Sequence, residues 1–117
     1  MPMNNDTGAD ESYLLALSAL NTLRFAAREI EDDATSHTLI EHAAEVERAL
    51  NDDYRRDRKP SLRVLQALFL LVRDYVGPLA RDEYFGSRYR EILQPLSAAI
   101  QARLAALDEK RPEMQRP

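Results

Sequence analysis

Two histidines are the only imidazoles in the chain, and acidic residues surround both. His37 and His42 lie close to Glu41 and Glu45, with His42 and Glu45 one helical turn apart. A carboxylate-bridged di-iron site needs Glu-x-x-His pairs from two helices together with further glutamates. Here the order of the pair is reversed and there is no second histidine-bearing helix. We therefore expect neither a metal site nor a cofactor, and interpret the cluster as a solvated helix face.

Other residue types that carry catalysis are also poorly placed. Nucleophilic catalysis needs a serine or threonine beside a base, and the chain contains no Gly-x-Ser-x-Gly sequence. It contains no cysteine, which excludes a cysteine nucleophile, thiolate metal sites and disulfides. Carboxylates are abundant, but runs such as Glu45, Glu47, Asp52 and Asp53 are typical of solvated helix faces. We therefore predict that the protein is not an enzyme.

Arg103 is the sharpest anomaly among residues that could bind a partner, because it lies on an apolar seam of the last helix. The seam follows a 4-3-4-3-4 spacing and consists of Tyr89, Leu93, Leu96, Ile100, Arg103 and Leu107. A charged side chain there must find an intrachain partner or extend to solvent. Alternatively, it is an arginine that anchors an interface. The sequence leaves both interpretations open.

A short aromatic segment precedes that helix. Tyr84 and Phe85 are adjacent and cannot both face the same core, so we expect at least one of them to be exposed or to lie at an interface. The alternative is that Phe85 closes the core and Tyr84 is merely amphipathic. We count both as candidate partner-binding residues.

Four basic residues form a patch just before Pro60: Arg55, Arg56, Arg58 and Lys59. The patch could touch nucleic acid or an acidic protein, or simply end a helix in a soluble loop. Acidic residues outnumber basic ones by 20 to 16, and the isoelectric point is near 5.2. This balance and the apolar helix that follows argue against nucleic-acid binding.

The elements that must position these residues are all helical. Apolar residues recur at helical spacing, and no stretch alternates as a strand does. We predict an all-α, single-domain bundle over residues 10–109, with flexible tails at 1–9 and 110–117. Its four main helices are mostly antiparallel, with one short extra segment. The predicted spans are 10–33, from Ser36 or Thr38 to about 54, 61–76, 78–85 (the short segment) and 87–109.

Capping residues, glycines and a proline set the expected helix boundaries. Thr7 and Asp10 have the form of a capping box, and Ser61 is a plausible cap. Gly77 should end the third long helix in a left-handed conformation, and Gly86 should stop the short segment. Pro95 should kink the last helix. Beyond it, small residues permit close helix approach: Ala98, Ala99, Ala102, Ala105 and Ala106.

More apolar surface is present than one small bundle readily hides. Leu14 and Phe25 lie outside the main stripe of the first helix, on a side shared with Ser18 and Thr22, and Leu70 lies in the polar sector of the third helix. Exposed apolar residues of this kind mark partner surfaces. We therefore expect a homodimer, or a site for a different protein, built on these two helices.

Location and origin can be stated only as expectations. The first ten residues do not resemble a signal peptide, and the longest apolar run, Ala67–Val72, is too short to span a bilayer, so we expect a cytoplasmic protein. Of the sixteen basic residues only Lys59 and Lys110 are lysines, a bias that suggests a GC-rich bacterial genome.

The function predicted from these features is that of a small bacterial regulator or adaptor. It would act by helix-mediated protein binding, as anti-activators, antitoxins and immunity proteins do. One alternative is a secretion or phage-assembly chaperone that holds a partner helix. Another is a bundle that binds a small molecule in a pocket opened by Pro95 and lined by Arg103 and tyrosines.

Overall fold

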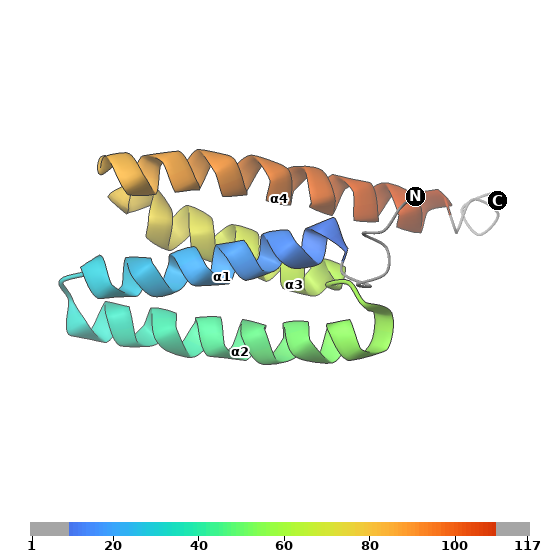
Figure 1. The fold of residues 1–117 in the computed structure, drawn as a ribbon, viewed down its shortest axis with the longest axis horizontal. Helices are drawn as coiled ribbons and strands as arrows, with labels where there is room; N and C mark the ends of the chain where they lie inside the picture. The colour runs from blue at the N-terminus through green and yellow to red at the C-terminus, as the bar shows by residue number, and fades with distance from the viewer. Residues whose placement is uncertain (1–9, 110–117) are drawn as a thin grey trace, which may run out of the picture.

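The computed structural model describes residues 10–109, which form four α-helices with antiparallel neighbours (Figure 1). The elements are α1 (Glu11–Glu29), α2 (Asp33–Asp57), α3 (Leu62–Leu71), a π-helical segment η2 (Val72–Val76), a 3₁₀ turn η3 (Gly77–Leu79) and α4 (Glu83–Glu109). The predicted all-α bundle of four main helices is confirmed. The predicted tails, 1–9 and 110–117, lie outside the described residues.

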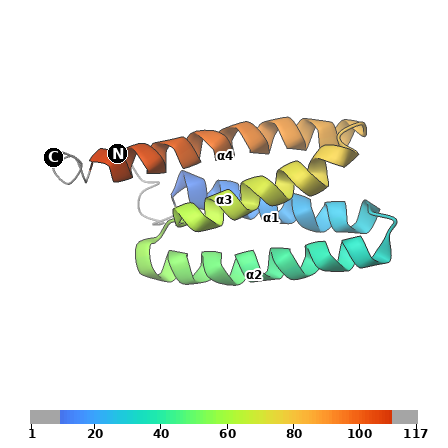
Figure 2. The same ribbon diagram turned by 180° about the vertical axis from the view of Figure 1, so that it is seen from behind.

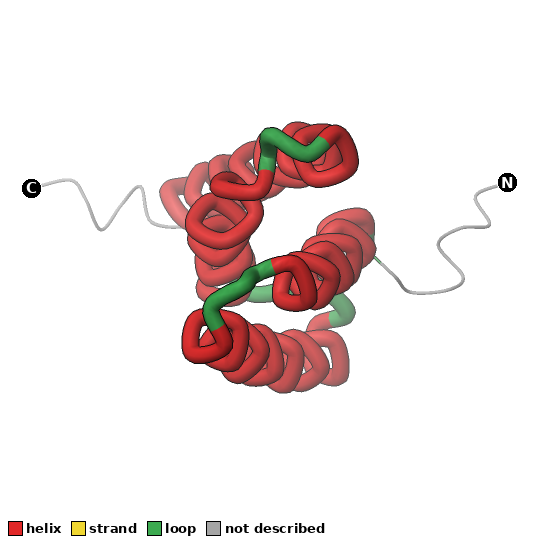
Figure 3. The backbone as a smooth tube through the Cα atoms, turned by 90° about the vertical axis from the view of Figure 1, so that its left-hand side faces the viewer, coloured by secondary structure: helices red, strands yellow, loops and turns green. Residues whose placement is uncertain are grey.

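The helices surround one core, with α2 and α4 on opposite edges of the bundle. α1 lies in front of α3 in Figure 1, and α3 lies in front of α1 in Figure 2, which shows the bundle from the opposite side. Figure 3 shows the same arrangement along the helix axes. The largest fully buried apolar side chains come from all four helices and η2: Leu20, Leu23, Leu39, Leu50, Leu65, Leu68, Val72, Val76, Ile92 and Leu96. Within residues 10–109, no helix combines the length and the apolar character needed to cross a membrane.

Carboxylate and hydroxyl caps decide where the first three helices begin. Asp10 accepts a hydrogen bond from the Ser12 amide at 2.7 Å, and Ser61 Oγ accepts one from the Val64 amide at 3.3 Å. The cap at Ser61 was predicted. Thr7, the other half of the expected capping box, lies outside the described residues.

The predicted boundary between the first two helices is wrong. α1 ends at Glu29 rather than near residue 33, and α2 begins at Asp33 rather than at Ser36 or Thr38. The reason is Asp32, whose carboxylate accepts from the Thr35 amide at 2.8 Å and caps α2. The acidic residues at the end of the predicted first helix therefore do not continue it. They connect α1 to α2 and form the start of α2.

The third long helix ends in a π-helical turn. The predicted span to Val76 is right in extent, but its last five residues are π-helical, and the Gly77 amide donates to the Val72 carbonyl. Leu68, Val72 and Val76 are fully buried and follow one another at intervals of four residues. Residues at this spacing lie close to one face of a helix, so the chain keeps a single buried line of side chains through the π-helical turn.

Neither of the two following glycines has the role expected from the sequence. Gly77 has a φ of −50°, so the predicted left-handed conformation is wrong. Gly86 does not stop a helix, because α4 begins at Glu83 and runs through it; the predicted short helix over 78–85 is replaced by the η3 turn. A Cβ on Gly86 would lie 2.6 Å from the Ala80 carbonyl oxygen. Its role is therefore to allow a close backbone approach.

Pro95 lies inside α4, and the kink predicted there stays a prediction.

Replacing Gly86 with Ala is expected to lower the free energy of unfolding by about 1–3 kcal/mol, because a backbone oxygen cannot move aside as a flexible side chain can. The measurement is urea unfolding followed by circular dichroism at 222 nm. Gly77→Ala is the matched control: its Cβ would meet the Tyr89 ring at 3.3 Å, so a smaller loss is expected. A gain of about 1 kcal/mol, usual for Gly→Ala inside a helix, would show that the contact at Gly86 is not tight.

Candidate binding groove between α1 and α4

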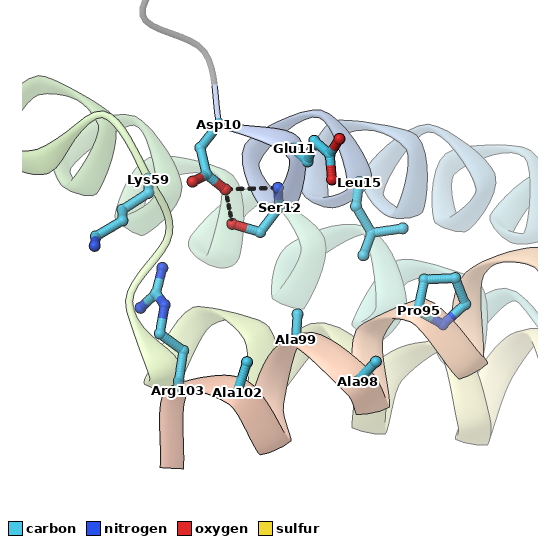
Figure 4. A pocket seen from close by; sticks show the side chains of 10 residues that line it. All are labelled: Asp10, Glu11, Ser12, Leu15, Lys59, Pro95, Ala98, Ala99, Ala102 and Arg103. Atoms are coloured by element: carbon cyan, nitrogen blue, oxygen red, sulfur yellow. Dashed lines mark hydrogen bonds between the residues drawn. The ribbon is translucent and has the colours of Figure 1, made fainter. Parts of the chain in front are cut away.

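An open groove of about 720 Å³ lies between the start of α1 and the C-terminal half of α4 (Figure 4). Its apolar lining comes from Leu15 on α1 and from Pro95 and three alanines on α4. The full lining is Asp10, Glu11, Ser12, Leu15, Lys59, Pro95, Ala98, Ala99, Ala102 and Arg103. The groove therefore joins an apolar floor to charged groups.

The groove exists because the side chains between the two helices become short along α4. Ala98, Ala99 and Ala102, predicted to permit close helix approach, line open space instead. Further along the same helix pair, Arg88 fills the space and donates from Nη2 to Ser18 Oγ at 2.8 Å. α1 and α4 are thus tied by a long polar side chain in one region and separated by a groove in another.

Arg103 anchors the charged end of the groove. Its side chain is half-buried and donates from Nη2 to the Pro60 carbonyl, which joins α4 to the connector between α2 and α3. The sequence left open an intrachain partner or an interface role, and the partner is a backbone carbonyl rather than a carboxylate. A guanidinium has five N–H donors. Since the residue also lines the groove, donors remain for a bound group.

Asp10 and Lys59 share this end of the groove with Arg103 (Figure 4). Partial burial acts to raise the pKa of the Asp10 carboxyl, but hydrogen bonds from the Ser12 hydroxyl and amide, with the positive charges of Arg103 and Lys59, outweigh it. The pKa of Asp10 is therefore held below its usual value. The carboxylate is ionised at neutral pH and balances part of the positive charge.

Asp10→Ala is expected to lower the free energy of unfolding at neutral pH by about 1 kcal/mol, the usual loss for an N-cap. A lowered folded-state pKa gives stability that is fully present above the usual value of 3.8 and lost as the pH falls through the folded pKa. The difference between wild type and Asp10→Ala should therefore shrink in acid. Urea unfolding between neutral pH and about pH 2 measures it. Asp10→Asn, which keeps a capping oxygen without the charge, should retain most of the cap. A difference that does not change with pH would contradict the role given to the charge.

The predicted basic patch is divided among separate partners. Arg55 pairs with Asp52 at 3.4 Å, Arg56 pairs with Asp53 at 2.9 Å, and Arg58 lies over the Tyr54 ring with its guanidinium carbon 5.0 Å from the ring centroid. Lys59 lines the groove. Of the four residues, the structure brings Lys59 to the candidate site, and a binding role for the patch stays a prediction.

Asp53 is a correction to the prediction of a solvated acidic face. Only 6% of Asp53 is exposed, and its Oδ2 accepts from the Ser61 amide at 2.8 Å while Oδ1 accepts from Arg56. The carboxylate fixes the chain between α2 and α3. It thereby positions Pro60, whose carbonyl accepts the Arg103 hydrogen bond, and Ser61, the N-cap residue of α3.

We expect Asp53→Ala to lower the free energy of unfolding by about 1–3 kcal/mol, because it leaves a partly buried amide without its acceptor. Asp52→Ala is the matched control one residue away, where an exposed side chain makes one surface ion pair; its effect should stay within about 0.5 kcal/mol. Chemical denaturation of both variants beside wild type gives the comparison. Equal effects would mean that the bond to Ser61 does not matter.

Three of the candidate partner-binding residues meet where α1 ends and α4 begins. The Phe25 and Tyr84 rings pack edge to face with centroids 6.2 Å apart, and Tyr84 packs against Phe85 at 5.1 Å. Tyr84 is 46% exposed, whereas Phe85 is only 5% exposed and belongs to the core. The interpretation that Phe85 closes the core therefore fits, and Phe85 supports the exposed rings rather than offering a surface itself.

Leu14 and Leu70 are exposed, as the prediction required. Leu14 belongs to α1 and Leu70 to α3. Their role in binding a partner stays a prediction.

One polar contact was missed at the sequence level. Thr22 is fully buried; its hydroxyl donates to the Ser18 carbonyl at 3.1 Å and accepts from Arg88 Nε at 3.3 Å. The four-residue spacing of Ser18 and Thr22 was visible in the sequence, but it indicated a polar side. That Arg88 of α4 reaches Ser18 and Thr22 on this side depends on tertiary pairing.

The histidine cluster has the geometry of a solvated helix face. His37 Nε2 lies 3.1 Å from Glu41 Oε2, and His42 Nδ1 lies 3.8 Å from Glu45 Oε1, with all four side chains more than half exposed. In the described part of the chain, no three histidine or acidic side chains come together in a way that could hold a metal ion.

The groove's lining is suited to non-covalent binding, because it offers an apolar floor and charges of both signs at its rim. Comparison of the chain with protein-family models, curated proteins and solved structures finds no match.

Proposed function

We propose that the protein is a small, non-catalytic bacterial adaptor or regulator that binds an amphipathic helix of a partner protein in the groove between α1 and α4. The observation that carries this proposal is the groove itself, which joins an apolar floor to the cations Arg103 and Lys59. Glu11 and Asp10, whose carboxylate already accepts from Ser12, lie beside them. An amphipathic helix laid into an apolar groove is a recurring mode of peptide recognition.

The lining indicates the chemistry of that helix. Ala98, Ala99 and Ala102 leave room for medium-sized apolar side chains, which would pack on them and on Leu15. An acidic side chain of the partner would reach Lys59 and the remaining donors of Arg103. The apolar contact gives affinity, whereas the charge contact fixes the register.

The proposed protein is a homodimer. Two variants of the proposed function differ in how the protein acts on its partner. A regulator binds a folded partner and alters its assembly. A secretion or phage-assembly chaperone instead keeps an otherwise insoluble partner in solution by covering its helix. Both use the same groove, and co-expression with an identified partner distinguishes them.

A second candidate is the binding of a small carboxylate, which the joint presence of Pro95 and Arg103 in the lining favours. The tyrosines expected in such a pocket are not among its lining residues. We therefore rank helix binding first.

The test uses a pair of fluorescent helical peptides that share one small apolar face and carry either Glu or Lys at the end of that face. The Glu peptide should bind with a micromolar dissociation constant, and the Lys peptide should bind about tenfold more weakly or worse, as fluorescence anisotropy measures. Ala102→Trp, which fills the groove, should abolish binding. Ala105→Trp is the control, because Ala105 is exposed on the same helix but does not line the groove.

Failure of both peptides to bind, or equal binding to both tryptophan variants, would contradict the proposal. Circular dichroism must show that both variants are folded. If instead small carboxylates stabilise wild type against heat and Ala102→Trp removes the effect, the groove is a small-molecule site.

A further inference from the structure

We infer that two copies of the chain associate through a surface at the opposite end of the α1–α4 pair from the groove. This surface, the aromatic end patch, consists of Phe25, Arg28, Glu29, Asp82 and Tyr84. The inference rests on the homodimer within the proposed function, and it assigns a surface to that homodimer. It does not depend on what binds in the groove.

The patch has the composition of a binding surface. Phe25 and Tyr84 are exposed aromatic rings in edge-to-face contact, and the buried Phe85 holds Tyr84 from below. Arg28 is held over the Phe25 ring, with its guanidinium carbon 5.5 Å from the ring centroid. Tyrosine and arginine are the residue types enriched where binding energy concentrates.

A second copy fits this patch because the patch is complementary to itself. In a two-fold symmetric contact the same surface of both copies meets, so each cation must find an anion on the other copy. Arg28 supplies the cation, and Glu29 and Asp82 supply anions. Among the residues that the structure describes, neither Arg28 nor Glu29 forms an ion pair within its own chain.

Asp82 and Glu29 differ in how free they are. Asp82 caps α4, accepting from the Tyr84 and Phe85 amides at 3.0 and 3.2 Å. Glu29 is exposed at the end of α1, beside Arg28. Glu29 of one copy is therefore the clearest partner for Arg28 of the other. A hollow of about 440 Å³ beside the rings gives room for an entering side chain.

The experiment is a charge exchange followed by sedimentation velocity over a micromolar concentration series. Wild type should be a dimer whose affinity falls with added salt. Arg28→Glu and Glu29→Arg should each raise the dimer dissociation constant about tenfold or more, because each places like charges opposite one another. An equimolar mixture of the two variants should regain the dimer, since one copy then carries only acids and the other only bases at these positions.

Arg48→Glu is the control, because Arg48 is an exposed arginine on α2 outside the patch; it should leave the dimer unchanged. A monomeric wild type, or a dimer that both exchanges leave intact, would overturn the inference, and so would failure of the mixture to recover.

Peptide binding to the groove, measured on the same variants, separates the two proposals. Retained peptide binding together with an undisturbed dimer overturns only the assignment of the patch. Recovery of the dimer in the mixture without any peptide binding overturns only the groove.

Discussion

The close backbone contact between Gly86 and Ala80 is the constraint on which the rest of the structure depends. It fixes where α4 starts relative to the turn that follows α3, since a side chain on Gly86 would collide with the Ala80 carbonyl. From that point α4 continues without a break to Glu109. The register set at this turn therefore decides which α4 residue reaches the other end of the bundle. That residue is Arg103, which meets the Pro60 carbonyl.

Unequal lengths of neighbouring helices explain the apolar surface at that other end. α3 begins only at Leu62, whereas α4 has 27 residues and projects beyond the start of α3 in Figures 1 and 2. Leu107 belongs to the same 4-3-4 seam as the buried Leu96, yet it is 48% exposed. A seam read from spacing shows which face a residue occupies. It does not show whether that face is covered.

The same distinction separates what the sequence could predict from what it could not. Periodicity predicted the helical class and the exposure of Leu14 and Leu70, because these depend on one helix at a time. Gly86 and Asp53 were misread, since a glycine near a turn indicates a stop and a carboxylate in an acidic run indicates solvent. Their actual roles depend on a carbonyl and an amide that the fold brings to them. Arg103 stood out locally, but the groove that it lines needs Asp10, which is far away in the chain.

The two proposed surfaces lie at opposite ends of one pair of antiparallel helices. α1 runs from the groove to the aromatic end patch, and α4 runs back from the patch to the groove. A dimer formed through the patch therefore leaves both grooves uncovered and directs them away from the shared interface. Such an assembly is bivalent: when one partner helix binds, a second helix on the same target assembly meets the other groove at a raised effective concentration. Weak binding in each groove then suffices for selective capture of targets that display two helices, because a target with one helix gains nothing from the second groove.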